Sequence, residues 1–524
     1  MTYLGTRVPL AAETEWLSSI EKAINSVFKP ITEWSTKIIF FEIPIPGTGT
    51  TAPFVTFWLV AAALIFTIYY RAVQVRGFPV SLEVIRGKYS HEQDEGEVTH
   101  FQALSSALSG TVGLGNIAGV GVAVVIGGPG ATFWMILAGL FGMATKFAEC
   151  TLGVKYREVH EDGSVTGGPF RYLPVAFGRF GKLPATIGTG LYAVAILLFG
   201  VAGGNMFQAN QTFAQAKEVT GGNDGFLGSD GAALIFGLVM AGLVAAVILG
   251  GIKSIAKVTS KLVPAMAAIY VIGCLIVIFT NVGQIPGAIV DIIVGAFNPD
   301  SVAGGAIGVL IVGVQRAAFS NEAGLGSAAI AHSPVKTRRP VSEGFVALLE
   351  PFIDTVIICT MTALTIIIAQ PPFYTSAQEK FAGGAVEPDG VVVTSKAFET
   401  VIPDFPIILA VAVALFAFST LITWSYYGLK AWTTLFGRTP FSENLYRVIF
   451  CLFTVIGTVL TFGQVLDFAD AMLFLTAFVN LLGVYLLLPV VKKEMTDYLA
   501  DRKSGALARE AAEPPPARAG RGAE

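Results

Sequence analysis

The chain has 524 residues, of which 53% are hydrophobic and 14% are charged. A soluble domain carries roughly 25% charged residues, so this chain has too few charges to coat the several soluble domains that its length would otherwise predict. The net charge of −3 excludes a basic surface for nucleic acid. The four cysteines lie in apolar segments and form neither a disulfide framework nor a zinc motif. Composition therefore predicts an all-α polytopic membrane protein.

Hydropathy along the chain predicts eleven membrane spans. Residues 1–53 are of mixed polarity, and the stretch from Trp16 to Phe41 is typical of a helix lying at the membrane interface. A first span is expected at about 54–70, and the tail 496–524 is expected to be disordered. Ten further apolar segments are long enough to span a bilayer: 99–127, 130–154, 185–212, 231–250, 262–280, 303–331, 344–369, 405–429, 446–462 and 466–490.

The distribution of lysine and arginine supports this count. When the connections between spans are assigned alternately to the two sides of the membrane, one side carries 25 Lys and Arg residues and the other carries 7. The remaining two Lys and Arg residues lie within spans. Cytoplasmic connections carry the excess of positive charge. The N-terminus is therefore expected outside and the C-terminus in the cytoplasm.

Two expected spans carry the same glycine-interrupted motif. Ser109-Gly-Thr-Val-Gly-Leu-Gly-Asn116 and Ser320-Asn-Glu-Ala-Gly-Leu-Gly-Ser327 both fit S-x-x-x-G-L-G and are 211 residues apart. The second copy lies five spans after the first, an odd number, so the two copies are expected to cross the membrane in opposite directions. Matching interrupted spans in opposed halves indicate an inverted-repeat transporter and the place of its binding site.

Such interruptions have a physical meaning inside a membrane. Unwound backbone survives there only where it is buried in protein or lines a polar cavity. Its free amides can hold a carboxylate, and its free carbonyls can hold a small cation. The alternative is that the glycines only allow close helix packing, but that does not explain the polar residues clustered with them.

Several further motifs carry a resemblance to a known family. Together with Gly113-Leu-Gly-Asn-Ile-Ala-Gly119 and Phe319-Ser-Asn-Glu-Ala-Gly-Leu-Gly-Ser327, the segments at 143–149, 204–210 and 418–428 resemble the alanine/glycine:cation symporters, or sodium:alanine symporters, of the amino acid-polyamine-organocation superfamily. The resemblance covers about residues 54–495. It implies the leucine-transporter fold, with an extra helix and linker at 54–98, a first repeat of five core helices at 99–302 and a second at 303–495.

The resemblance also implies the function. A secondary active symporter of this family couples inward Na⁺ flux to the uptake of alanine, glycine and sometimes D-alanine by alternating access. Na⁺ is the expected coupling ion, no other cofactor is implied, and the expected place is the plasma (inner) membrane. The residues that the resemblance implies for the substrate are Thr111, Gly113, Gly115, Asn205, Gln208, Phe319, Thr420 and Trp424.

A cation site is indicated by the residues themselves as well. Ser419 and Thr423 are spaced i, i+4, so they share one helix face with Thr420 beside them. Hard cations prefer oxygen ligands, and backbone carbonyls at Ser109 and Val112 would complete a Na⁺ shell. The alternative is that the hydroxyls only bond to their own helix. A second ion is expected at Asn116 with the Thr111 carbonyl.

Charged residues within spans are the remaining functional candidates. Lys146 and Glu149, spaced i, i+3, are expected to pair on one helix face as a structural or gating pair. Arg316 and Glu322 flank the second interruption and could pair with other core residues or gate the cavity. Glu350 and Asp354 could relay protons or bind a cation, but a packing role near water is favoured. Asp467 and Asp470 start the last span, and the favoured interpretation is an interfacial position at its N-terminal end.

Three other functions remain open from the sequence. A carrier of the same fold could take another solute, such as serine or a methylamine, or could couple to protons. An ion channel could use the two interruptions as a filter. A membrane enzyme is disfavoured, because no HExxH or GxSxG motif and no convincing pair of catalytic carboxylates occurs.

Overall fold

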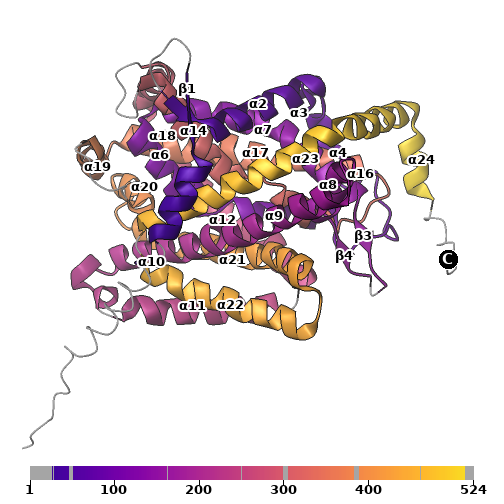
Figure 1. Cartoon of the computed structure of the whole chain (residues 1–524). Coiled ribbons are helices and arrows are strands. Elements are labelled where there is room, and N and C mark those ends of the chain that lie inside the picture. The colour runs from indigo at the N-terminus through magenta and orange to yellow at the C-terminus, as the bar shows by residue number, and fades with distance from the viewer. Residues whose placement is uncertain are drawn as a thin grey trace, which may run out of the picture.

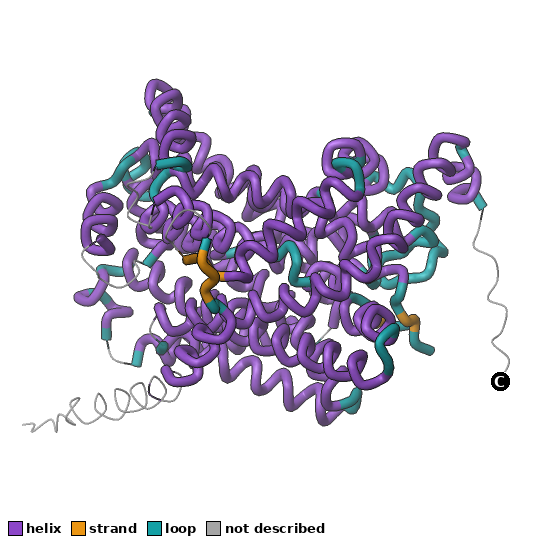
Figure 2. Tube along the Cα trace, turned by 45° about the horizontal axis from the view of Figure 1, so that its top comes forward, coloured by secondary structure: helices purple, strands orange, loops and turns teal. Residues whose placement is uncertain are grey.

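A computed structural model describes residue 26 and residues 29–45, 51–161, 163–229, 231–249, 251–298, 305–382, 389–460 and 462–513. These residues are almost entirely helical (Figure 1). The strands form two short antiparallel pairs, which lie apart in Figure 2, one left of centre and the other at the right: β1 (Glu42–Pro44) with β2 (Thr51–Pro53), and β3 (Glu158–Val159) with β4 (Val165–Thr166). Of the interfacial helix expected at 16–41, the structure describes residues 29–39 as helical, and most of the rest lies outside the described residues.

The first half of the chain forms long apolar helices joined by short ones. The helices in chain order are α2 (Phe54–Tyr69), α3 (Val73–Arg76), α4 (Phe78–Ile85), α5 (His100–Thr111), α6 (Val120–Gly127), α7 (Gly130–Lys155), α8 (Pro169–Gly178), α9 (Lys182–Val201), α10 (Phe207–Val219), α11 (Ala232–Ile248), α12 (Gly251–Thr280) and α13 (Ile285–Gly295). π-helical turns join α5 to α6 at Gly115–Gly119 and α9 to α10 at Ala202–Met206.

The second half of the chain is also built of long and short helices. Its helices are α14 (Gly305–Asn321), α15 (Ser327–His332), α16 (Pro340–Ala347), α17 (Leu349–Pro351), α18 (Thr360–Ala369), α19 (Pro372–Ala382), α20 (Gly390–Glu399), α21 (Phe405–Phe436), α22 (Pro440–Val459), α23 (Phe462–Ser504) and α24 (Ala506–Ala512). A π-helical stretch, Phe352–Cys359, joins α17 to α18. Helix thus extends past residue 496, where the tail was expected to be disordered, and an ion pair between α24 and Arg339 holds it against the body.

Seven helical segments are long and apolar enough to cross a membrane within the described residues: Gly130–Lys155, Lys182–Val219, Gly251–Thr280, Pro340–Ala369, Phe405–Phe436, Pro440–Val459 and Val465–Ser504. Taken together, α5 and the helical segment Gly115–Gly127 are also long and apolar enough to cross a membrane, and they are bent by 51° at the break between them. Shorter apolar helices lie at Phe54–Tyr69 and Ala232–Ile248, where two further spans are expected. The protein is therefore a multi-pass membrane protein.

The connections sort to two ends of the molecule. The β3–β4 hairpin and α24 belong to the connections rich in Lys and Arg, and both lie at the right in Figure 1. β1, α19 and α20 belong to the connections poor in Lys and Arg, and they lie at the left. This grouping agrees with the alternation that the charge distribution predicts.

A chain of buried charged residues joins five helices near the end that is rich in Lys and Arg. Lys146 Nζ of α7 lies 3.2 Å from Glu350 Oε1 of α17. His332 of α15 bridges Glu350, at 3.6 Å, and Glu343 of α16, and Glu343 also contacts His100 of α5. Inside a membrane protein such groups are costly unless they are paired. The network therefore holds the ends of these helices together as one body.

The expected pairing of Lys146 with Glu149 is wrong. Lys146 pairs with Glu350, and Glu149 turns instead to Asn480 of α23, whose Nδ2 donates to Glu149 Oε1 at 2.6 Å. Spacing along α7 puts Lys146 and Glu149 on neighbouring positions of one face. The carboxylate on the adjacent helix offers Lys146 better geometry.

Replacing Lys146 should be far more costly than replacing an exposed lysine. Lys146→Met leaves the buried Glu350 carboxylate without its cation, and we expect a loss of about 3–5 kcal/mol in unfolding free energy. Lys155→Met is the control, because Lys155 pairs with Glu494 in a partly exposed position and should lose less than about 1 kcal/mol. Denaturant unfolding of the purified protein in detergent measures both. If the double variant Lys146→Met/Glu350→Leu is no more stable than Lys146→Met, the pairing is not the cause.

Candidate functional site

The first glycine-interrupted segment is unwound in the structure. Helix α5 ends at Thr111, and Val112 is extended (φ −74°, ψ 91°) before the chain becomes helical again at Gly115. Thr111 and Val112 are buried, and the Val112 amide still bonds to the Leu108 carbonyl of α5. The interruption therefore falls at the expected residues, and the amides released from the helix come directly after Val112.

The released amides of this first break are taken by two side chains. The Gly113 amide donates to Asn116 Oδ1 at 2.8 Å, and the Leu114 amide donates to Gln208 Oε1 at 3.3 Å. Gln208 reaches in from α10 and is held by a bond from its Nε2 to the Gly203 carbonyl at 3.1 Å. The two acceptors are uncharged oxygens on rotatable side chains, so a stronger acceptor such as a carboxylate can replace them.

Glycine is required at Gly113 because the chain packs closely there. A Cβ at Gly113 would lie 2.6 Å from Thr420 Oγ1 and 3.3 Å from Gln208 Oε1. Gly115 faces α14 instead, where a Cβ would lie 3.4 Å from both the Phe319 ring and the Ser320 Cα. The first break therefore contacts α10 and α21 on one side and α14 on the other.

The four hydroxyl residues of the expected cation site lie together between α5 and α21. Thr420 Oγ1 donates to the Ser109 carbonyl at 3.0 Å, and Thr423 Oγ1 donates to Ser109 Oγ, also at 3.0 Å. Ser109 Oγ donates to the Ser419 carbonyl at 2.7 Å, while Ser419 Oγ bonds within its own helix to the Phe416 carbonyl. Thr420 and Thr423 thus bond across to α5. Ser419 Oγ also lies 3.7 Å from Met266 Sδ of α12, so purely local bonding holds for none of the three hydroxyls.

Aromatic side chains wall this region. Trp424 is buried against Phe199, with ring centroids 4.8 Å apart, and it approaches α9 and α10 so closely that a Cβ at Gly204 would lie 2.3 Å from its Cγ. Phe319 packs against Phe207 at 5.1 Å and Phe199 at 6.0 Å. Trp424 and Phe319, the two expected wall residues, are therefore joined through Phe199.

Asn205 is directed elsewhere. Its Nδ2 donates to the Phe450 carbonyl of α22 at 2.7 Å, and its Oδ1 is buried with no bonding partner within the described residues. It lies on the same π-helical turn as Gly204, which contacts Trp424. In this state the amide therefore ties the turn to α22 and does not contact the first break.

The second glycine-interrupted segment is also unwound, between Asn321 and Ser327, with φ of 55° at Glu322, 102° at Gly324 and 74° at Gly326. Its backbone groups are paired by anchored side chains. The Gly326 amide donates to Glu149 Oε1 at 3.1 Å, Asn480 Nδ2 donates to the Gly324 carbonyl at 2.8 Å, and Tyr192 donates to the Leu325 carbonyl at 2.9 Å. One further amide of the second break, that of Ala323, donates to the neutral Asn321 Oδ1 at 2.9 Å. The first break differs in that both of its described amide contacts, from Gly113 and Leu114, are to neutral side chains.

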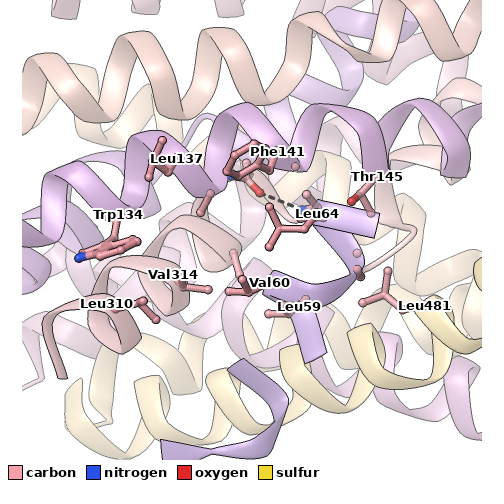
Figure 3. Close-up of a pocket in the computed structure, with 18 residues that line it drawn as sticks. Leu59, Val60, Leu64, Trp134, Leu137, Phe141, Thr145, Leu310, Val314 and Leu481 are labelled. Atoms are coloured by element: carbon pink, nitrogen blue, oxygen red, sulfur yellow. Dashed lines mark hydrogen bonds between the residues drawn. The ribbon is translucent and has the colours of Figure 1, made fainter. Parts of the chain in front are cut away.

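The second break borders an apolar pocket of about 270 Å³ between α2, α7, α14 and α23 (Figure 3). Leu64, Leu137 and Val314 are typical of its lining, and none of the lining residues is charged. Thr145 and Asn321 are among its few polar side chains. A pocket of this kind suits apolar groups, so a charged amino acid would not be held here.

The two breaks meet at Asp354, a residue whose role the sequence left open. Asn116 Nδ2 donates to Ser320 Oγ at 2.9 Å and to Asp354 Oδ1 at 2.7 Å. Ser320 and Thr355 donate their hydroxyls to Asp354 Oδ2 at 2.7 and 2.8 Å. Asp354 is fully buried and forms no ion pair with any described Lys, Arg or His residue. Because 238 residues separate it from Asn116, no local pattern could have placed it here.

Arg316 packs against the aromatic wall on the side that faces the end of the molecule whose connections are poor in Lys and Arg. It forms an ion pair with Asp470 of α23, and its guanidinium lies over the Phe319 ring, 5.5 Å from the centroid. Both charged residues are almost completely buried. Asp470 is therefore not a solvated residue at the start of the last span, which was the favoured structural interpretation, but the partner of Arg316.

The arrangement of broken helices defines the class of protein. The fold resembles that of the solved transporter MhsT in complex with L-phenylalanine, with a TM-score of 0.52 and 16% identity over 80% of this chain and 99% of that chain. This likeness concerns the fold alone, which is that of the leucine-transporter group of membrane transporters.

Sequence comparison gives the family. The profile of the sodium:alanine symporter family matches residues 45–512, and the chain belongs to this family. The sodium/alanine symporter AgcS of Methanococcus maripaludis is 38% identical over 87% of this chain and 96% of its own length. The amino-acid carrier protein AlsT of Bacillus subtilis is 34% identical over 85% of this chain and 90% of its own length. The protein is therefore a membrane transporter and not an enzyme.

A methyl group at Gly113 should block the site, while one at a nearby glycine should not. Gly113→Ala places a Cβ against Thr420 and Gln208, whereas at Gly119, in the following π-helical turn, a Cβ would meet no atom within 4 Å. We expect Gly113→Ala to reduce uptake of radiolabelled alanine by more than about tenfold, which corresponds to roughly 1.4 kcal/mol, and Gly119→Ala to retain it. Equal uptake by the two variants, at equal amounts in the membrane, would remove Gly113 from the site.

Proposed function

We propose that the protein is a secondary active symporter that couples inward Na⁺ flux to the uptake of small neutral amino acids: alanine, glycine and D-alanine. The observation that carries this proposal is the contact between the two unwound segments at Asn116 and Ser320, beside a cluster of hydroxyls on α21. The sodium:alanine symporter family and the relative named as a sodium/alanine symporter support the substrate and the ion.

The proposed architecture has eleven spans, with five core helices in each of the repeats 99–302 and 303–495. The N-terminus lies outside and the C-terminus in the cytoplasm of the plasma (inner) membrane. The excess of Lys and Arg in alternate connections supports this orientation. The matching interruptions in α5–α6 and α14–α15 support the repeat.

The substrate carboxylate binds at the first break. Backbone amides at the start of a helix attract anions, and the amides of Gly113 and Leu114 bond to the neutral oxygens of Asn116 and Gln208 in this state. A carboxylate replaces these oxygens, and the released Gln208 side chain can then contact the substrate. Thr111 and Gly115 flank the same amides, and Thr420 lies beside them.

The walls favour a small side chain. Phe319 lies next to Gly115, and Trp424 lies one helical turn beyond Thr420, which contacts Gly113. Close packing of Trp424 on Gly204 and Phe199 holds the indole in place. Within such a wall, each extra methylene must displace an aromatic ring. Alanine and glycine therefore fit, and larger amino acids are excluded.

Two cation positions follow from the oxygen atoms. The first has the hydroxyls of Ser419, Thr420 and Thr423 with carbonyls at Ser109 and Val112, where Thr420 and Thr423 already reach across to α5. Oxygen ligands of this kind suit a hard cation. Na⁺ bound there joins α5 to α21 directly.

The second cation position is at Asn116, with the Thr111 carbonyl. Asp354 strengthens the case. Its carboxylate is buried inside a membrane span and forms no ion pair with a described residue, so it needs a counter-charge. A cation at this junction would contact both breaks. It would also lie close to the carboxylate of a substrate held at the first break, so each ligand raises the affinity for the other.

Alternating access then follows from the two ionic clusters. The Arg316–Asp470 pair and Phe319 close the site toward the outside. The network around Glu343 and Glu350 keeps α5, α7 and α15–α17 together at the cytoplasmic end. These helices move as one body against α10, α21 and α22, and so expose the site to each side in turn.

The choice of ion and substrate is tested by uptake into proteoliposomes. An inward Na⁺ gradient should drive accumulation of radiolabelled alanine above its outside concentration, and a proton gradient of equal size should not. Glycine and D-alanine should compete, whereas serine and methylamine should compete weakly. Uptake driven by protons alone would assign another coupling ion. Current without any amino acid and without accumulation would identify a channel.

The hydroxyl of Thr420 should be required for uptake. Thr420→Val keeps the shape but removes the hydroxyl that bonds to the Ser109 carbonyl at 3.0 Å. The proposed Na⁺ site then loses one oxygen ligand, and we expect uptake of alanine to fall by at least about tenfold, or roughly 1.4 kcal/mol. Thr476→Val is the matched control, because the buried Thr476 hydroxyl bonds within α23, to the Met472 carbonyl. Normal uptake by Thr420→Val would exclude Thr420 from the site.

A further inference from the structure

A basic pocket lies at the end of the molecule that is rich in Lys and Arg. It has a volume of about 340 Å³ and is enclosed by the turn after α2, by α3, by the start of α4, by α16 and by the last part of α23. Figure 1 shows α3, α4, α16 and this part of α23 toward the same side of the molecule as α24. Its cationic lining residues are Arg71, Arg76, Lys492 and Arg502.

One of these four cations is neutralised by the protein. Arg502 donates two hydrogen bonds of 3.0 Å to the carboxylate of Glu83 on α4. These bonds lower the pKa of Glu83 to about 2, so Glu83 stays ionised at neutral pH. The pair fixes the end of α23 against α4 and forms one wall of the pocket.

The other three cations have no carboxylate partner among the described residues. Lys492 Nζ lies 4.3 Å from the centroid of the Tyr69 ring, a contact that leaves its charge in place. Arg71 and Arg76 form no ion pair with any described residue and are exposed. The pocket therefore carries an excess of three positive charges, and its occupant must be an anion.

The backbone beside the pocket is held in an unfavourable conformation. Arg71 and Ala72 are consecutive non-glycine residues with φ of 55° and 53°, a region that L-residues rarely adopt. The turn is fixed by the bond from the Ala72 amide to the Thr67 carbonyl at 2.7 Å and by Gln74, which donates to Thr67 Oγ1 at 3.2 Å. Backbone strain of this kind collects at ligand sites, and here it sets the position of Arg71 at the pocket.

The floor of the pocket is apolar. Val73, Val80, Phe345 and Met495 line it and are buried. A soluble anion such as phosphate would use the cations only and leave these side chains without a partner. An amphiphile whose anionic head lies next to an apolar portion satisfies both parts of the lining.

We propose that this pocket binds the phosphate headgroup of an anionic phospholipid, with Arg71, Arg76 and Lys492 around the phosphate and the lipid's apolar portion against Val73, Val80 and Met495. Basic pockets at the cytoplasmic ends of spanning helices suit such headgroups. A lipid held there joins α3 and α4 to α16 and α23. This proposal is independent of the transported solute and holds whether or not the protein carries alanine.

Titration of the purified full-length protein with dioleoylphosphatidylglycerol, followed by native mass spectrometry, tests the site. The variant Arg71→Gln/Arg76→Gln/Lys492→Gln should bind this lipid about a hundredfold more weakly, since each Lys or Arg near a membrane surface contributes roughly fivefold. The matched control is Lys253→Gln/Lys257→Gln/Lys261→Gln, which removes three exposed lysines from α12 outside the pocket. Its affinity should change by less than about threefold.

Three results would overturn the proposal. One is equal weakening in the two triple variants, which would show attraction by net charge only. Another is equal binding of dioleoylphosphatidylcholine, and the third is full displacement of the lipid by millimolar inorganic phosphate, which would identify a site for a soluble anion. Size-exclusion chromatography checks folding, and Arg71→Lys/Arg76→Lys should keep most of the affinity. If the triple variant aggregates, Arg76→Gln alone should weaken binding about fivefold.

Discussion

The structure depends on how unwound backbone is paired inside a membrane. Each break removes several helical hydrogen bonds, and hydrocarbon supplies no replacement. At the first break the replacement acceptors are the side-chain amides of Asn116 and Gln208, which are neutral. At the second break the partners include Glu149, Asn480 and Tyr192, which are anchored in α7, α23 and α9, and the neutral Asn321, which accepts from the Ala323 amide. In the proposed mechanism the same motif serves as a binding site at the first break and as a joint at the second.

The strengths of the contacts separate the parts that move from the parts that stay together. Charged pairs such as Lys146–Glu350 are costly to break once buried, so they belong inside one body. The contacts of Ser109 with Thr420 and Thr423 are neutral hydrogen bonds, each with a net contribution of about 0.5–1.5 kcal/mol. A boundary made of such bonds can be rearranged by the binding of one ion. The weaker contacts lie between α5 and α21, where the proposed motion requires them.

The sequence predicted those features that depend on local pattern. The motif at Ser109 and its copy at Ser320 placed both interruptions correctly, because glycines grouped with polar residues inside an apolar span favour a break in the helix. The spacing of Ser419 and Thr423 correctly placed their hydroxyls beside Thr420, since helical periodicity alone decides which residues share a face.

Features that depend on distant contacts were missed. The partner of Lys146 is on another helix, 204 residues away, and spacing along α7 suggested Glu149 instead. Asp354 was a candidate without a known partner, and Asn480 and Tyr192 are ordinary residues in their own helices; the contacts of all three arise only when distant helices pack together. Pairing inside a membrane is decided by geometry between helices. A buried charge therefore shows that a partner exists, but its identity follows only from the fold.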